Sequence, residues 1–221
     1  MCDFCFGVAP AMKSFSNTYI FIYVSILVVV MVVLLSGLTL GLKSRQEMNF
    51  AADKASQILR AAGYDELEGQ AAADLFDRVA VRGAGEQECY TMQCADGTTG
   101  TVVRVGGKGL WGPIWGYVVI AQDGKTIKGV TFSHKSETPG LGANITETKF
   151  CSQFVGKSIY DAAGRSTSVR VLKPGREPQV AAANRVDAIT GATLTSNGVD
   201  AMLQQLPTLL DSIRQTQPAT R

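Results

Sequence analysis

The sequence predicts an α+β protein: one N-terminal transmembrane helix followed by a single mixed domain with antiparallel strands. Three observations support this class: an uncharged apolar stretch at Tyr19–Leu42, β-branched runs separated by glycine-rich turns, and strands and helices that mix without βαβ regularity. We expect an N-terminal segment at 1–18, the transmembrane helix at 19–42, a helical connecting segment at 43–80, the main domain at 81–214 and a C-terminal tail at 215–221.

The apolar stretch is long enough to cross a bilayer. Tyr19–Leu42 contains 24 residues, of which 19 are apolar and none is charged. A secretory signal has an apolar region of roughly 7–15 residues, so an uncleaved anchor is the preferred interpretation; a cleaved signal and a buried core helix are the alternatives. Lys43, Arg45 and Lys54 follow the stretch while Lys13 precedes it, so the positive-inside rule places the large domain in the cytoplasm. Met12 is an alternative start, so residues 1–11 can lie outside the translated chain.

Composition excludes several function classes for the remaining 179 residues. A formal net charge of +2 over the whole chain argues against a nucleic-acid binder, which concentrates Lys and Arg on one face. The single histidine, His134, excludes histidine-clustered metal sites, and we expect it to be a hydrogen-bonded structural residue. The five cysteines form no iron–sulfur spacing. Any redox cofactor is therefore expected to be organic.

The elements after the anchor follow from periodicity and turn residues. A helix is expected over Gln46–Ala62, ended by Gly63, and a second from Asp65 to Val79. Three strands are expected at Thr101–Val105, Trp115–Ala121 and Thr126–Ser133, the last two joined by a tight Asp123-Gly124 turn. Further along we expect a polar loop at His134–Gly142, a helix at Glu147–Val155, a strand at Ser168–Leu172 and a helix at Thr195–Arg214 that Pro207 kinks or ends.

A stretch of small and hydroxyl residues precedes the last helix. Residues 187–199 read DAITGATLTSNGV, and exposed N–H groups at a helix start, with a glycine and an alanine nearby, can bind a phosphate. Thr195, Ser196 and Asn197 are also ordinary helix-capping residues, which is the simpler interpretation of the spacing. Within this stretch Asp187–Thr193, reading DAITGAT, resembles the motif of proteins that carry FMN as a phosphoester on its last threonine. That residue is Thr193 here.

Three further segments resemble one family, NqrC, the C subunits of the Na+-translocating NADH:quinone oxidoreductases. They are the anchor followed by Lys43-Ser44-Arg45-Gln46, the GKGLWGPIWGY segment at Gly107–Tyr117, and the SETPGLG segment at Ser136–Gly142. The G subunits of the related Rnf electron-transport complexes share the ETPGLG-like loop and the attachment motif. The Gly-Leu-Trp-Gly sequence at 109–112 is more similar to the NqrC family.

The resemblance implies a membrane-anchored flavoprotein that relays electrons in a sodium pump oxidising NADH and reducing ubiquinone. It implies the other Nqr subunits (A, B, D, E and F) as partners and a flavin transferase that attaches the FMN. It also implies an FMN-binding domain on the periplasmic side of the bacterial inner membrane, where the charge count predicts the cytoplasm. We follow the resemblance, because the charge bias depends on two or three residues.

The candidate cofactor-binding residues come from these motifs, and we expect neither a residue that does the redox chemistry itself nor a metal ligand. The candidates are Thr193, as the covalent attachment point, with Asp187, Thr190, Gly191, Ala192, Glu137, Thr138, Leu141, Gly142, Trp111 and Trp115. Asp187 is either read by the transferase or orders the turn. The 137–142 loop, by resemblance, faces the flavin, and composition alone favours a surface turn. The two tryptophans either stack near the flavin or belong to the core.

Two alternatives to this function remain at the level of sequence. One is an Rnf-type protein, and the other is a membrane-anchored assembly module without covalent flavin. The C-x4-C spacing of Cys89 and Cys94 leaves a disulfide open in an oxidising compartment, and Cys151 is expected to pack in a helix.

Overall fold

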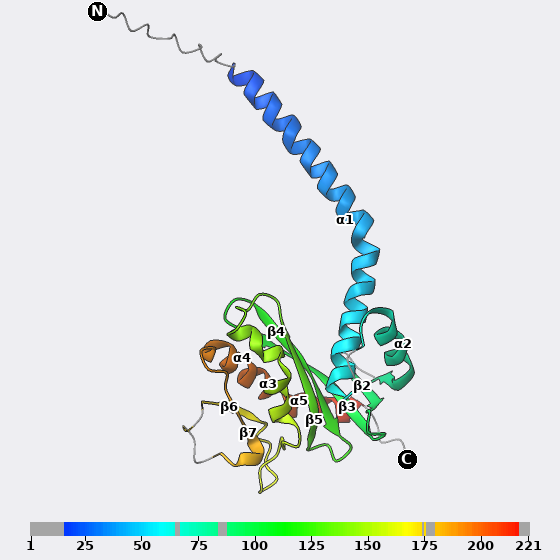
Figure 1. Cartoon of the computed structure of the whole chain (residues 1–221), viewed down its shortest axis with the longest axis vertical. Helices are drawn as coiled ribbons and strands as arrows, with labels where there is room; N and C mark the ends of the chain where they lie inside the picture. The colour runs from blue at the N-terminus through cyan, green and yellow to red at the C-terminus, as the bar shows by residue number, and fades with distance from the viewer. Residues whose placement is uncertain (1–15, 65–66, 84–87, 174, 176–179, 217–221) are drawn as a thin grey trace, which may run out of the picture. The chain divides into compact units, whose positions relative to one another are not determined.

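The structure is a computed structural model that describes residues 16–64, 67–83, 88–173, 175 and 180–216 (Figure 1). The chain divides into two compact units, with the boundary between Met48 and Asn49. The expected cap residue Asp65, Cys2, Cys5 and most of the expected tail lie outside the described residues.

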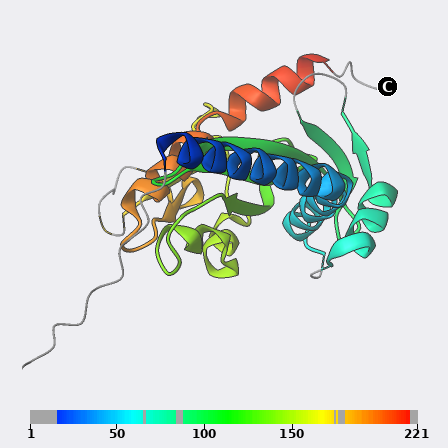
Figure 2. The same cartoon turned by 90° about the horizontal axis from the view of Figure 1, so that it is seen from above.

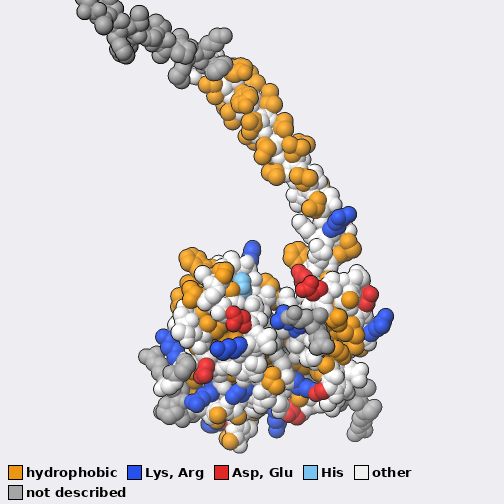
Figure 3. Space-filling model, in the orientation of Figure 1, with side chains coloured by type: hydrophobic (Ala, Val, Ile, Leu, Met, Phe, Trp, Pro, Cys, Tyr) orange, Lys and Arg blue, Asp and Glu red, His pale blue; other side chains and the backbone are white. Residues whose placement is uncertain are grey.

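The described part of the first unit is the exposed portion of a single long helix. Helix α1 (Asn17–Ala61) contains the whole predicted anchor and is long and apolar enough to cross a membrane. At about 1.5 Å per residue the 24 anchor residues span about 36 Å, against about 30 Å for a bilayer core. None of these residues is buried, and apolar side chains follow one another along the visible face in Figure 3. A buried core helix is therefore the wrong interpretation, and the helix fits a single-pass membrane protein.

The second unit is built on an antiparallel sheet of five strands. They are β1 (Ala80–Arg82), β2 (Cys89–Gln93), β3 (Thr99–Lys108), β4 (Pro113–Ala121) and β5 (Ile127–His134), and each pairs with its neighbour in sequence. Asp123 forms the β4–β5 turn by accepting hydrogen bonds from the N–H groups of Lys125 (2.8 Å) and Thr126 (2.9 Å), and Gly124 has a φ of +66°. The predicted α+β class and the predicted hairpin are confirmed.

The helices cover both faces of this sheet. The end of α1 and α2 (Gly69–Val79) lie on one side, and α3 (Thr148–Cys151) and α4 (Thr193–Leu203) lie on the other (Figures 1 and 2). Alternate residues of each strand enter two separate cores: Val102 and Val119 pack with Ile58 and Leu59, whereas Val103 and Val118 pack with helix α4. Residues 49–61 of α1 thus belong to the core of the second unit.

The remaining elements are short and lie between the sheet and α4 in the sequence, except for helix α5, which follows α4. They are the 3₁₀ helices η1 (Gly142–Thr146), η2 (Ser152–Phe154) and η3 (Ala182–Asn184), the parallel strands β6 (Arg170–Leu172) and β7 (Arg185–Asp187), and helix α5 (Leu206–Thr216). The helix expected at Glu147–Val155 is one α-turn followed by η2. The helix expected at Thr195–Arg214 begins two residues earlier and is divided into α4 and α5. Pro207 is the second residue of α5, where a missing N–H costs no hydrogen bond.

The cysteine pair that the sequence left open is not bonded. Cys89 belongs to the core beneath α4 and Cys94 to the core beneath α1, so the sheet lies between their side chains. Their odd spacing explains this, because successive side chains of a strand point to opposite faces. Cys89 and Cys94 are buried, Cys151 is partly buried, and none of the three forms a disulfide. Burial raises the pKa of all three thiols.

Candidate functional site

The DAITGAT turn ends at the first residue of α4. Strand β7 ends at Asp187, and the turn closes where the N–H of Ala192 donates to the carbonyl of Ile189 (3.1 Å). Gly191 has a φ of +81°, a conformation that favours glycine. Thr193 begins α4 with its side chain exposed, while Ala192 before it is buried. The turn therefore presents the hydroxyl of Thr193 to solvent at the positive end of a helix.

The 137–142 loop packs directly against this turn. A Cβ added at Gly191 would lie 2.9 Å from Cδ2 of Leu141, so the two segments are in close contact. The carbonyl of Thr138 accepts hydrogen bonds from the N–H groups of Leu141 (3.2 Å) and Ala143 (3.1 Å), which turns the loop. Two segments about 50 residues apart in the sequence are thus brought together.

Glu137 joins three segments through one buried carboxylate. Its Oε2 accepts a hydrogen bond from Oγ1 of Thr195 in α4 at 2.6 Å, and its Oε1 accepts one from the N–H of Trp111 at 2.8 Å. Its own N–H donates to Nδ1 of His134 at 3.2 Å, so this histidine is a hydrogen-bonded structural residue, as expected. Gly142 has no room for a Cβ, which would collide with Oε2 of Glu137.

The electrostatics keep this carboxylate ionised. Burial raises the pKa of Glu137, but the hydroxyl of Thr195 and the N–H groups of residues 110–112 outweigh burial and hold the pKa below its usual value. With 5% of its surface exposed, Glu137 is occupied by partners within the protein. The local geometry makes it a structural anchor of the loop, and its contact with the flavin stays a prediction.

The two tryptophans have different surroundings. Trp111 lies beside Glu137 with 66% of its surface exposed, on the loop between β3 and β4. Trp115 packs against the core beneath α1, and its Nε1–H donates to Oε1 of Gln57 at 3.3 Å. Trp115 therefore faces away from the DAITGAT turn, on the opposite side of the sheet, and we leave it out of the candidate site.

Two hydroxyl residues at the start of α4 were not among the sequence candidates. Thr195 is 1% exposed and reaches Glu137, and Oγ of Ser196 accepts a hydrogen bond from the N–H of Ile189 at 3.1 Å. The sequence placed both among ordinary capping residues. The run of hydroxyl residues in the first helical turn was the sequence feature that pointed to them. The partner of Thr195, Glu137, is 58 residues away in the sequence, so that run could not predict the bond.

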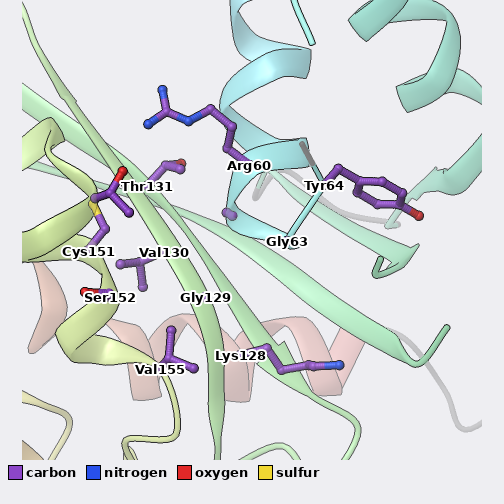
Figure 4. Close-up of a pocket in the computed structure, with 12 residues that line it drawn as sticks. Arg60, Gly63, Tyr64, Lys128, Gly129, Val130, Thr131, Cys151, Ser152 and Val155 are labelled. Atoms are coloured by element: carbon purple, nitrogen blue, oxygen red, sulfur yellow. The ribbon is translucent and has the colours of Figure 1, made fainter. Parts of the chain in front are cut away.

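Two hollows in the described part of the second unit differ in what lines them. One, of about 600 Å³, borders the motif and is lined by Asn144, Glu147, Lys149, Phe150, Gln153 and residues 187–190. This volume is within the range of ligand sites. The other has a volume of about 380 Å³ and lies beside β5 (Figure 4). The end of α1 and the turn after it contribute Arg60 and Tyr64, and α3 and η2 contribute Cys151 and Ser152. It contains none of the candidate residues.

The residues at the turn suit a phosphate tether better than a metal. Among the described residues no group of three or more His, Cys, Asp or Glu side chains could hold a metal ion. An exposed threonine hydroxyl at the start of an 11-residue helix offers an attachment atom, and the free N–H groups of a first helical turn favour negative charge there.

Comparison with known proteins points to the same part of the chain. The family model described as FMN-binding domain matches residues 109–206. The NqrC protein of Neisseria meningitidis, the C subunit of a Na(+)-translocating NADH-quinone reductase, is 30% identical over 230 residues, covering 84% of this chain and 87% of the relative. The corresponding protein of Pseudomonas aeruginosa is 36% identical over 150 residues, covering 64% of this chain and 57% of the relative.

Solved structures of such proteins share the fold. The crystal structure of the C subunit from Parabacteroides distasonis is similar with a TM-score of 0.69 and 33% identity, covering 80% of this chain and 98% of that one. The NqrC structure from Shewanella oneidensis, at 23% identity and a TM-score of 0.58, supports the fold alone.

Proposed function

Because the chain belongs to the NqrC family of the Na(+)-translocating NADH-quinone reductases, we propose that it carries FMN covalently on Thr193 and relays electrons in that enzyme. It is a flavoprotein subunit of this oxidoreductase, with an FMN-binding domain and an apolar N-terminal helix. The observation that carries the covalent proposal is the exposed hydroxyl of Thr193, at the end of DAITGAT and at the first residue of α4.

Attachment requires an activated flavin. In the proposed step Oγ of Thr193 attacks the FMN phosphorus of flavin adenine dinucleotide. The new Oγ–P bond replaces the anhydride bond, AMP leaves, and the hydroxyl proton passes to solvent or to a base of the flavin transferase. Thr190, Gly191 and Ala192 shape the turn that the transferase approaches, and Asp187 orders it or is read by the transferase.

The bound flavin supplies the electron transfer, and this chain holds and orients it. No dinucleotide-binding fingerprint or phosphate-binding Walker loop occurs in the sequence, so NADH is handled by another part of the complex. The proposed partners are the other Nqr subunits, A, B, D, E and F, and the coupled ion is Na⁺. Leu141, Gly142, Thr138 and Trp111 form the loops beside the turn and are the proposed neighbours of the flavin, held in place by Glu137.

The proposed location is the bacterial inner membrane, with the FMN domain on the periplasmic side. The charge count around the anchor favours the opposite orientation by two or three residues only, and other subunits can fix the topology during assembly. A reporter enzyme that functions only in the periplasm is expected to be active when it is fused after Arg221. Activity of a cytoplasm-only reporter at that position would contradict the placement.

The covalent link is tested by flavin fluorescence of the denatured protein on a gel. The full chain expressed with a functional flavin transferase is expected to give a fluorescent band, and Thr193→Ala is expected to remove the signal completely. Thr208→Ala is the matched control, because it removes an exposed threonine hydroxyl near the start of another helix, α5, and should leave the band fluorescent. A dark wild-type band would favour an assembly module without covalent flavin, and a fluorescent Thr193→Ala band would show that the flavin is attached to another residue.

A further inference from the structure

We propose that the hydrogen bond between Thr195 and Glu137 is a positioning lock that fixes the first turn of α4 so that Thr193 faces outward for flavin attachment. The inference rests on the proposed attachment at Thr193 and adds two residues that act through it. Neither Thr195 nor Glu137 touches the flavin in this role.

The helix geometry links the two threonines. Two residues along an α-helix rotate the side chain by about 200°, so Thr193 and Thr195 point to nearly opposite sides of α4. Thr195 is 1% exposed and points inward to Glu137, whereas Thr193 is exposed. The direction of Thr193 is therefore set by what holds Thr195.

The partner of Thr195 is itself held firmly. The Glu137 carboxylate also accepts the N–H of Trp111, and the Glu137 N–H donates to His134 at the end of β5. Its location between three segments leaves it little freedom to follow a displaced helix. A hydroxyl donating to a carboxylate at 2.6 Å is a charge-assisted hydrogen bond, which is about twice as strong as a neutral one.

The lock acts where a helix is weakest. The first turn of a helix lacks intrahelical partners for its N–H groups and opens more easily than the middle. In α4 the cap residue Ala192 makes no side-chain capping bond. Within the described residues, Thr195 to Glu137 and Ser196 to the N–H of Ile189 are the side-chain hydrogen bonds that hold this first turn. Loss of the first is expected to let the turn open while the sheet stays folded.

The experiment measures the rate of flavin incorporation into the purified full chain by a flavin transferase supplied with flavin adenine dinucleotide. Thr195→Val removes the hydroxyl at nearly constant volume, and Thr195→Ser retains it. We expect Thr195→Val to slow incorporation about tenfold or more, and Thr195→Ser to stay within about threefold of wild type.

The matched control is Thr131→Val. Thr131 is also a buried threonine, and its Oγ1 donates to the carbonyl of Gln57 at 2.9 Å on the other face of the sheet. The same chemical change there should leave the incorporation rate unchanged. Hydrogen exchange of the amides at 189–196 is the second readout, and it should accelerate in Thr195→Val but remain as in wild type in Thr131→Val.

The outcomes separate this inference from the proposed function. Equal rates for Thr195→Val and Thr131→Val, or a Thr195→Ser as slow as Thr195→Val, would overturn the lock while leaving attachment at Thr193 intact. Flavin on Thr193→Ala would instead overturn the proposed function. If Thr195→Val does not fold, Glu137→Leu tests the same bond from the acceptor side, because leucine has no acceptor atom, and incorporation at the wild-type rate in that variant would overturn the lock.

Discussion

The two faces of the sheet have similar apolar centres but different edges. We call the edge of the α4 face, where Glu137 and Thr195 hold the start of that helix, its rim. Beneath α1 the core is closed by apolar side chains such as Ile58 and Leu59, and the hydroxyl of Thr131 is satisfied by a backbone carbonyl. Beneath α4 the centre is equally apolar, with Met202 and Leu203 fully buried, but the rim is a carboxylate and a threonine that hold a helix start.

This difference separates the interactions that stabilise the fold from those that orient the attachment residue Thr193. Apolar packing on either face contributes in proportion to the area it removes from water and has little directional preference. The hydrogen bonds of Glu137 and Thr195 are directional, so they fix the orientation of one turn. The face beneath α1 therefore packs the sheet against the helix that leads to the anchor, and no attachment residue has to be oriented there.

The largest expected effects come from matched cavities on the two faces. Leu59→Ala and Leu203→Ala each remove a fully buried leucine, and each is expected to lower the free energy of unfolding by about 2–5 kcal/mol. Denaturant unfolding of the full chain in detergent measures both. At a temperature where both variants remain folded, flavin incorporation should slow only in Leu203→Ala, because Leu203 lies in the helix that carries Thr193. Equal slowing in Leu59→Ala would break the division between the faces.

Sequence patterns predicted the parts of this arrangement that depend on neighbouring residues. The β-branched runs predicted β3, β4 and β5, and Asp123-Gly124 predicted the turn between the last two. Strands β1 and β7, with three residues each, were missed because so short a segment shows no alternation. Strand β2 was missed because its sequence, CYTMQ, lacks a β-branched run.

The parts that depend on register and distant partners were harder. Trp111 and Trp115 belong to one motif, yet only the register of β4 shows that Trp115 points to the α1 face. Glu137 was selected as a flavin contact from its loop, and its partners Thr195 and Trp111 become visible only after the chain folds. The attachment threonine was readable because its motif is contiguous; whether it carries flavin is for the gel experiment to decide.

A smaller effect is expected in how the free energy of unfolding depends on pH through the Glu137 carboxylate. Because its hydrogen bonds hold the pKa of Glu137 below the unfolded value of about 4.5, the stabilisation is present above that value and is lost as the pH falls through the lower folded-state pKa. Glu137→Gln should cost about 1.5–3 kcal/mol near neutral pH, the range for hydrogen bonds to a charged group. The cost should shrink below pH 4.5, and urea unfolding at pH 7 and at pH 3.5 measures the difference.

The hairpin carboxylate provides the control for this pH experiment. The pKa of Asp123 is also lowered, since the hydrogen bonds from Thr126 and Lys125 outweigh its burial, so Asp123→Asn should likewise lose less stability than wild type on acidification. Asp123 lies at the β4–β5 turn, away from α4, and its substitution should leave flavin incorporation unchanged. A Glu137→Gln variant that lost as much stability as wild type between the two pH values would show that the Glu137 carboxylate does not stabilise the rim through its charge.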